Sequence, residues 1–302
     1  MTLVFGMLLD ALLGEPKWLW SRIPHPAVLM GRLIGWCDDS FNTGDRKRLM
    51  GILTIAGLCI AAAILGWIIQ LAPGYLLDVI VLAVLLAQKS LVDHVQAVGD
   101  ALRLSLGDGR RSVAMIVGRD TKDMDGTAVA RSAIESAAEN LSDGVIAPIF
   151  WFALAGVPGL LIYKITNTAD SMIGYRTPKH ADFGWGAAKL DDLLNLVPAR
   201  LTAVLIWTVT GRPYPKPIIA DAPLHRSLNA GWPEAAMAHG LDIALSGPRS
   251  YDGKIKDYPF VNEDGERSLG PDDIDRAVAV LWKTWRLTLG LAFVLATIVR
   301  IL

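Results

Sequence analysis

The sequence has little cysteine and almost no net charge. Its two cysteines, Cys37 and Cys59, lie in a polar and an apolar segment respectively, so we expect neither a disulfide framework nor a CxxC metal site. The formal net charge is -1, which gives no global basic field to hold nucleic acid, and we expect no nucleic-acid partner. Function must therefore be sought in apolar segments and in local clusters of charge.

Familiar catalytic motifs are also missing. The chain contains no GxxxxGK[ST] or GxGxxG phosphate-binding motif, no HExxH and no GxSxG. Residues 1–13 lack the basic start and the small-residue cleavage site of a signal peptide, so we expect a retained membrane or interfacial helix. Any catalytic site has to be inferred from clustered side chains.

Hydrophobic residues are abundant. They make up 52% of the 302 residues, and the mean hydropathy of +0.38 is typical of a membrane protein. Residues 50–72 are uncharged and long enough to cross a hydrocarbon core of about 30 Å. After a Pro-Gly turn, residues 75–91 return as the second helix of a hairpin, and residues 284–302 form a final apolar helix. Basic residues precede the hairpin and none lies in its turn, which predicts cytoplasmic outer ends.

Two further apolar segments, 145–162 and 198–210, are short for a span. Gly156, Pro158 and Gly159 interrupt the first of them. A single crossing would place its polar flanks on opposite sides of the membrane. We favour a re-entrant pair of half-helices, because broken backbone is tolerated at membrane depth where protein or water covers it.

These segments predict the fold class and the domain organisation. We expect a single, mainly α-helical, polytopic membrane domain over residues 1–302. It combines a helical hairpin with broken or re-entrant helices, and its polar catalytic loops face the cytoplasm. The long polar region, 212–283, belongs to these loops.

Four charged residues precede the first short apolar segment at steps of four. Arg131, Glu135, Glu139 and Asp143 share one face if the segment is helical. A solvated face with an Arg131–Glu135 ion pair of about 0.2–0.5 kcal/mol explains the same spacing. Charge beside a membrane segment is costly unless it binds something, so the placement favours a Mg²⁺ site.

Other polar clusters follow the apolar segment. Asp170 and Arg176 lie in ITNTADSMIGYR, where a helix cap or an ion pair is the alternative to a binding role. Asp191 and Asp192 are adjacent, so at most one of them faces a given metal on a helix. Arginine side chains suit phosphate because their planar fork matches it, although a surface position is the commoner role of any one arginine.

Long motifs cover nearly the whole chain and resemble those of one family. The chain is similar to the CobD/CbiB cobalamin-biosynthesis proteins, the adenosylcobinamide-phosphate synthases. It departs from the expected pattern at Leu228, where proline is expected, and at Tyr258-Pro259-Phe260, where Pro-Trp is expected. The motifs are LLDALLGEP, PHPAVLMGRLI, VGRDT, AIESAAENLSDGVIAPIFW, NTADSMIGYR, FGWGAAKLDDLLNLVPARLTA and HRSLNAGWPEAAMAHGL.

The resemblance implies a multi-pass enzyme of the inner membrane with its active site facing the cytoplasm. Such an ATP-dependent carbon–nitrogen ligase would join adenosylcobyric acid, a corrinoid carboxylate, to aminopropanol phosphate or a related phosphorylated amino alcohol. ATP and Mg²⁺ would be required, and the product would be adenosylcobinamide phosphate. The expected partners are these substrates and the membrane. A homo-oligomer and an association with later membrane enzymes of the pathway are both open alternatives.

The clusters and the resemblance together predict the site residues. An AmpE-like regulatory protein and a transporter remain as alternatives, but neither needs metal-binding and phosphate-binding residues together. As catalytic residues we expect Glu139, Asn140, Asp143, Lys189 and Asp192. For substrate or phosphate binding we expect Arg119, Asn167, Arg176, His225, Arg226 and Asn229, and for metal binding Glu135, Glu139, Asp143 and Asp170.

Overall fold

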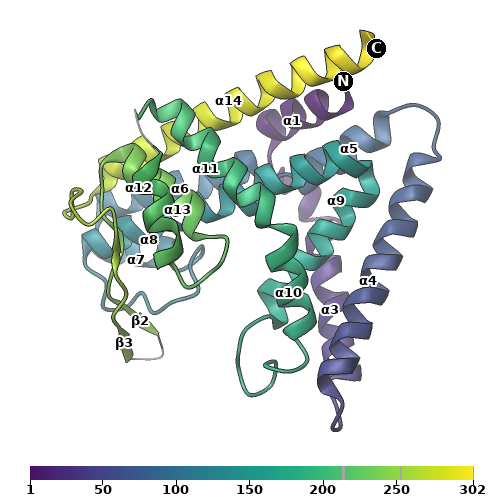
Figure 1. Ribbon diagram of the computed structural model, residues 1–302, viewed down its shortest axis with the longest axis horizontal. Coiled ribbons are helices and arrows are strands. Elements are labelled where there is room, and N and C mark those ends of the chain that lie inside the picture. Colours follow the sequence, from purple (N-terminus) through teal and green to yellow (C-terminus); the bar gives the residue numbers. More distant parts are fainter. Residues whose placement is uncertain (213–214, 252–253, 302) are drawn as a thin grey trace. The chain divides into compact units, whose positions relative to one another are not determined.

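The computed structural model describes residues 1–212, 215–251 and 254–301, which are mainly helical (Figure 1). Four residues of the predicted polar region, 213–214 and 252–253, lie outside the described residues. The chain divides into two compact units, each assembled from segments that are distant in the sequence. The first contains Met1–Ala87, Ala147–Leu196 and Leu295–Leu302, and the second contains Gln88–Ile146 and Val197–Val294.

The first unit is a helical assembly built around two crossing helices, α4 and α9. A Cβ atom at Gly66 of α4 would lie 2.5 Å from the Cα of Pro158 in α9, so glycine permits this close approach. Ile34, Leu58, Ile165 and Phe183 belong to the apolar core beside it. The helices are α1 (Thr2–Leu13), α2 (Lys17–Trp20), α3 (Pro26–Phe41), α4 (Lys47–Gln70), α5 (Leu76–Leu85), α9 (Ala147–Ile173) and α10 (Trp185–Leu194).

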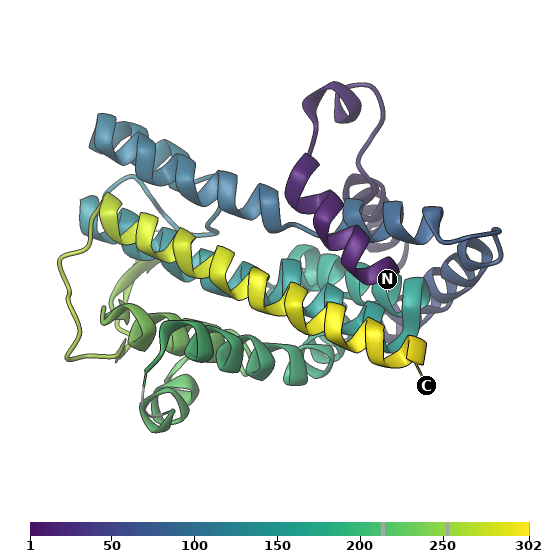
Figure 2. The ribbon, with the colours of Figure 1, turned by 90° about the horizontal axis from the view of Figure 1, so that it is seen from above.

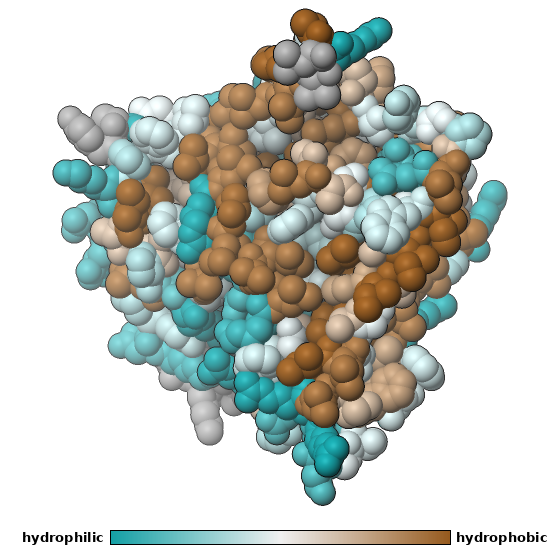
Figure 3. Space-filling model, turned by 45° about the vertical axis from the view of Figure 1, so that its right-hand side comes forward, coloured by the Kyte–Doolittle hydropathy of each residue, from teal (hydrophilic) through white to brown (hydrophobic). Residues whose placement is uncertain are grey.

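The first predicted span, 50–72, is confirmed as the long apolar helix α4. Only 17% of its most apolar window is buried inside the protein. Large side chains such as Leu53, Ile60 and Trp67 are exposed on it. Hydrophobic side chains, brown in Figure 3, cover much of the face shown there. Apolar surface of this extent is typical of contact with lipid.

The second predicted span, 75–91, is wrong as a single helix. Helix α5 has only ten residues and ends at Leu85, the chain is extended at Leu86, and α6 begins at Gln88. Neither glycine nor proline marks this break, so no local signal predicts it. A ten-residue helix is about 15 Å long, too short for a hydrocarbon core.

The predicted interruption of segment 145–162 is confirmed. Helix α9 departs from helical geometry at Ala155 and Gly156, where Gly156 has a φ of 62° that glycine adopts without strain. The helical path, however, extends beyond the predicted segment at both ends, through the π-helix η1 (Ser142–Ile146) and on to Ile173. The re-entrant path stays a prediction.

Three helices of the described chain are long and apolar enough to cross a membrane, which suggests a membrane protein. They are Lys47–Gln70, Gly126–Ile173 and Pro271–Ile298. A fourth span results if the pair Trp185–Leu194 and Leu196–Thr210, bent by 43°, counts as one. The second helix of this pair matches the predicted segment 198–210. The predicted last helix, 284–302, begins earlier, because α14 runs from Pro271 to Ile301.

The second unit packs helices around α8 and adds two short two-stranded sheets. Gln96 and Arg103 of α6 bond to Asp275 of α14 at 2.9 and 2.6 Å, and the two helices run side by side in Figure 2. Strand β1 pairs antiparallel with β4, and β2 with β3. The elements are α6 (Gln88–Leu104), α7 (Leu106–Val113), α8 (Gly126–Leu141), η1, α11 (Leu196–Thr210), α12 (Lys216–Asp221), η2 (Ala222–Leu224), α13 (Gly231–Leu241), β1 (Leu245–Ser246), β2 (Arg249–Tyr251), β3 (Lys254–Lys256), β4 (Phe260–Val261) and the first part of α14 (Pro271–Ile301).

Candidate functional site

A buried carboxylate on α8 organises the charged residues of the second unit. The side chain of Glu135 is only 2% exposed. Its Oε2 accepts a hydrogen bond from Arg119 at 2.8 Å, and its Oε1 accepts one from the Ser246 backbone amide at 2.6 Å. Arg249 donates to Oε1 at 3.4 Å. One carboxylate therefore fixes two guanidinium groups, because charge-assisted bonds are strong and directional.

The ion pair between Arg131 and Glu135, considered from their spacing, is absent from the described residues. Arg131 instead donates to two backbone carbonyls, that of Ala244 at 3.2 Å and that of Arg267 at 2.9 Å. Its guanidinium is held in place without a carboxylate partner in the described part of the chain. Glu135 and Asp125 lie near enough to favour the positive charge of Arg131 without forming an ion pair with it.

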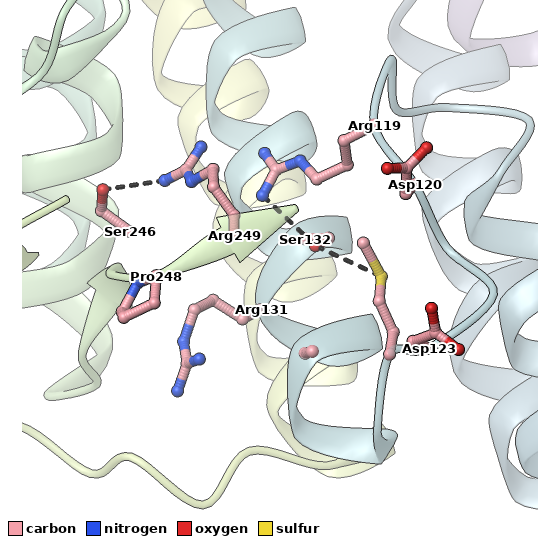
Figure 4. A pocket seen from close by; sticks show the side chains of 10 residues that line it. Arg119, Asp120, Asp123, Arg131, Ser132, Ser246, Pro248 and Arg249 are labelled. Carbon is pink, nitrogen blue, oxygen red and sulfur yellow. Dashed lines mark hydrogen bonds between the residues drawn. The ribbon is translucent and has the colours of Figure 1, made fainter. Parts of the chain in front are cut away.

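These arginines line a cavity of about 390 Å³ in the second unit. The side chains of Arg119 and Arg249 are only 13% and 8% exposed, so both charges are largely removed from water. In Figure 4 their guanidinium groups lie next to one another, with the two aspartates on the Arg119 side. The lining residues include Arg119, Asp120, Asp123, Arg131, Ser132, Ser246, Pro248 and Arg249.

His225 lies close to this cavity and is held neutral. Its Nδ1 accepts a hydrogen bond from the Ser227 amide at 3.0 Å, so the ring proton sits on Nε2, 3.5 Å from Oε1 of Glu234. Burial, followed by the positive charge of Arg249, lowers the pKa of His225 to about 4. A neutral imidazole with its proton on Nε2 is therefore the form present at neutral pH.

Glu234 of α13 is a buried acid that the sequence reasoning missed. Its side chain is 3% exposed, and among the described residues its Oε2 has no hydrogen-bond partner. Burial and the nearby negative charges of Glu135 and Glu139 raise its pKa well above the usual range. Its position among small apolar residues, in GWPEAAMAHG, is the signal that could have found it.

The other residues predicted in the second unit have varied surroundings. Glu139 and Asn140 are exposed at the end of α8, where the Asn140 amide donates to the Ser136 carbonyl at 2.9 Å. Asp143 lies half-buried in the π-helix that follows. Arg226 lines a second, much smaller hollow that it shares with His225, Ser246, Arg249 and Tyr258.

Asn229 has a structural partner. Its Oδ1 accepts a hydrogen bond from Arg200 at 3.0 Å, and the residue is buried. Arg200 also stacks on the ring of Trp232, with its guanidinium carbon 4.8 Å from the ring centroid. Asn229 therefore anchors the HRSLNAGWP loop.

Five predicted residues, Asn167, Asp170, Arg176, Lys189 and Asp192, belong to the first unit. Asn167 donates to Oδ1 of Asp191 at 3.2 Å. Asp192 instead pairs with Lys189 at 2.8 Å on the surface, and Arg176 is exposed.

Of the two adjacent aspartates in the first unit, the structure thus places Asp191 in the buried network. A second amide, that of Asn195, also donates to Asp191, at 3.0 Å, and the carbonyl of the same Asn195 accepts from Tyr163 at 3.0 Å. Helix periodicity does not choose between the adjacent carboxylates, because it only predicts that they point in different directions.

The predicted metal ligands do not form a cluster. In the residues described, no three His, Cys, Asp or Glu side chains are grouped to hold a metal ion. Both oxygens of Glu135 already accept bonds, two of them from arginines. Glu135 therefore fits the role of positioning Arg119 and Arg249 better than that of a metal ligand.

Comparison with known proteins decides the family. A family model described as "CobD/Cbib protein" matches residues 3–281. The chain belongs to this family. No solved structure matches the chain significantly.

Curated relatives in this family are similar to the chain over nearly its full length. "Cobalamin biosynthesis protein CobD" of Sinorhizobium fredii (strain NBRC 101917 / NGR234) is 47% identical, with 94% of this chain and 92% of the relative covered. The protein of the same name from Brucella anthropi is 45% identical, with 96% and 94% covered. That from Rhodobacter capsulatus is 42% identical, with 92% and 91% covered.

Proposed function

We propose that this protein is the amide-forming ligase that joins adenosylcobyric acid to aminopropanol phosphate or a related phosphorylated amino alcohol, giving adenosylcobinamide phosphate. Relatives named for cobalamin biosynthesis support a role in that pathway. The observation that carries the ligase chemistry is the cavity on which Arg119, Arg131 and Arg249 converge. Buried arginines of this kind suit a phosphate-bearing substrate.

The reaction has to activate a carboxylate before an amine can attack it. In our proposal the corrinoid carboxylate oxygen attacks the γ-phosphorus of ATP and the bond to ADP breaks. The amine then forms the bond to the acyl carbon, phosphate leaves with the bonding electrons, and the amine nitrogen loses a proton. Arg119, Arg131 and Arg249 would neutralise negative charge on the transferred phosphoryl group.

Mg²⁺ would offset phosphate charge and hold the phosphates in line for transfer. It commonly binds through one or two carboxylates together with substrate phosphate, so a cluster of three protein carboxylates is not required. Glu139 and Asp143 remain the proposed ligands in the second unit, and Asp170 stays a proposed ligand in the first unit. Glu135 is proposed instead to position Arg119 and Arg249, because those arginines already occupy its oxygens.

The remaining residues keep their proposed roles. Arg226 and His225 border the hollow that shares Arg249 with the larger cavity, which supports a place near the phosphate of the amine substrate. The protein would be a multi-pass enzyme of the inner membrane with its site facing the cytoplasm, where ATP is found. It would act alone, as a homo-oligomer or beside later membrane enzymes of the pathway.

Product formation by the purified protein tests this function. The detergent-solubilised full chain is incubated with adenosylcobyric acid, aminopropanol phosphate, ATP and Mg²⁺, and the product is identified by mass spectrometry. We expect adenosylcobinamide phosphate and ADP in equal amounts, and neither when ATP is omitted. Absence of the amide under these conditions, together with uptake of the corrinoid by vesicles that contain the protein, would instead indicate a transporter.

A further inference from the structure

Two aromatic side chains pack against arginines of the cavity in the second unit. The guanidinium carbon of Arg249 lies 5.4 Å from the centroid of the Tyr258 ring. That of Arg131 lies 5.3 Å from the centroid of the Phe260 ring. Both distances are within the range of about 6 Å over which the face of an aromatic ring attracts a cation. The described cavity lining includes both arginines and neither ring, so the rings contact the arginines rather than the cavity itself.

We propose that Tyr258 and Phe260 are positioning residues, which hold the guanidinium groups of Arg249 and Arg131 in the cavity. Tyr258 lies two residues before Phe260, the first residue of β4, so one short segment supplies both rings. This segment is also where the sequence departs from the expected Pro-Trp. The use of these arginines for a phosphoryl group rests on the proposed function, whereas their positioning rests on the ring contacts alone.

The strand that carries Phe260 also shapes the turn before Arg249. Ser246 of β1 pairs with Phe260 of β4, and the amide of Gly247 donates to the carbonyl of Pro259 at 3.3 Å. A Cβ atom at Gly247 would lie 2.4 Å from the Phe260 ring, so the ring packs directly on this glycine, which has a φ of 81°. The turn that leads into Arg249 at the start of β2 therefore also fixes the ring that contacts Arg131.

An aromatic ring can hold a guanidinium group without cancelling its charge. Arg249 and Arg267 lie near enough to Arg131 to repel it. Another carboxylate would offset this repulsion, but it would also remove positive charge that an anionic ligand needs. The face of an aromatic ring attracts a cation through its quadrupole and carries no net charge. Phe260 does this for two arginines, because the guanidinium carbon of Arg267 lies 4.6 Å from the centroid of the same ring.

Chemical labelling of arginines in the detergent-solubilised full chain tests the positioning directly. Phenylglyoxal modifies guanidinium groups, and mass spectrometry of the resulting peptides gives a rate for each arginine. Phe260→Leu and Tyr258→Leu each remove a ring and keep an apolar side chain. The rate at Arg111, which is 76% exposed, serves as the internal reference in every variant.

We expect each leucine variant to change the labelling of its own arginine. Phe260→Leu should raise the relative rate at Arg131, and Tyr258→Leu that at Arg249, each about 2- to 30-fold. Labelling of Arg119 should stay unchanged, because its hydrogen bond to a carboxylate does not involve either ring.

Two further variants separate positioning from stability. Phe260→Trp should keep the wild-type labelling rate at Arg131, because tryptophan presents the best ring face to a cation. Phe183→Leu is the control for a loss of stability alone, since Phe183 lies in the apolar core of the first unit. It should lower the Tm without a selective change in labelling at Arg131 or Arg249.

The amide-forming assay gives a second readout. Guanidinium groups that are held less firmly should stabilise the transferred phosphoryl group less well, so Phe260→Leu should lower kcat/KM for ATP about 2- to 30-fold. Phe260→Trp should restore kcat/KM to the wild-type value. A structural loss that lowers only the amount of folded protein would leave KM and the relative labelling rates unchanged.

Two results would overturn the proposal. One is unchanged relative labelling of both Arg131 and Arg249 in the leucine variants. The other is an equal rise at Arg119, Arg131 and Arg249, which would show a loosened fold rather than the loss of two contacts. The outcome is separate from the function itself, because the wild-type protein is assayed for the amide in parallel. Selective labelling without amide formation would refute the ligase and leave the positioning role standing.

Discussion

Replacing Glu135 by glutamine keeps the size of the side chain and removes its charge. The two guanidinium groups that Glu135 holds are 13% and 8% exposed, so they would remain buried without their counter-charge. Removing one partner from a buried ion pair typically costs about 3–5 kcal/mol. We therefore expect Glu135→Gln to lower the apparent Tm by roughly 10 °C.

Glu234→Gln is the matched control for this prediction. Glu234 is about as buried as Glu135 and lies in the same unit. Burial raises the pKa of Glu234 well above the usual range and so favours its neutral form, which glutamine resembles. No arginine forms an ion pair with Glu234 among the described residues, and Nε2 of His225 lies 3.5 Å from its Oε1, so the expected loss is about 1 kcal/mol or less.

Thermal unfolding of both variants in detergent at pH 7, followed by circular dichroism, measures the difference. Each variant is compared with the wild-type protein at the same scan rate, because large proteins commonly unfold irreversibly. Equal melting temperatures for Glu135→Gln and Glu234→Gln would refute the argument. They would show that the charge of Glu135 does not stabilise Arg119 and Arg249.

Four further predictions concern protonation, metal, topology and substrate. NMR of labelled histidine should show His225 neutral at pH 6 and titrating near pH 4, and titration near pH 6.5 would contradict its burial. Asp143→Asn and Glu139→Gln should each keep the fold and lose most activity. Near-native turnover at limiting Mg²⁺ would show that these two carboxylates are only polar side chains on a helix face and bind no metal. Cysteine at Thr177 should be labelled from the cytoplasmic side, and periplasmic labelling would exclude the re-entrant path of α9. Arg226→Ala should raise KM for the amine far more than it lowers kcat, and a raised KM for ATP instead would move Arg226 to the nucleotide.

Much of the helical framework follows from the sequence alone. The long uncharged stretch of α4 predicts an apolar helix. Gly156 marks the break in α9, because glycine adopts positive φ without strain. The end of α5 at Leu85 could not be predicted, since no residue there disfavours a helix. Close to that end α5 packs against α1, where Leu82 fills the space beside Gly6.

For the candidate site, too, the sequence predicted some features and the folded structure alone showed others. Helix periodicity correctly placed Glu135 and Glu139 on the last turns of one helix, α8. It also suggested Arg131 as the partner of Glu135, because spacing along a helix reports only neighbours three or four residues away. The actual partners, Arg119 and Arg249, come from other segments and meet Glu135 only in the folded chain. The sequence alone determined which charged residues exist and on which helices they lie. The tertiary structure decided which of them pair and which face a cavity, because burial makes an unpaired charge costly.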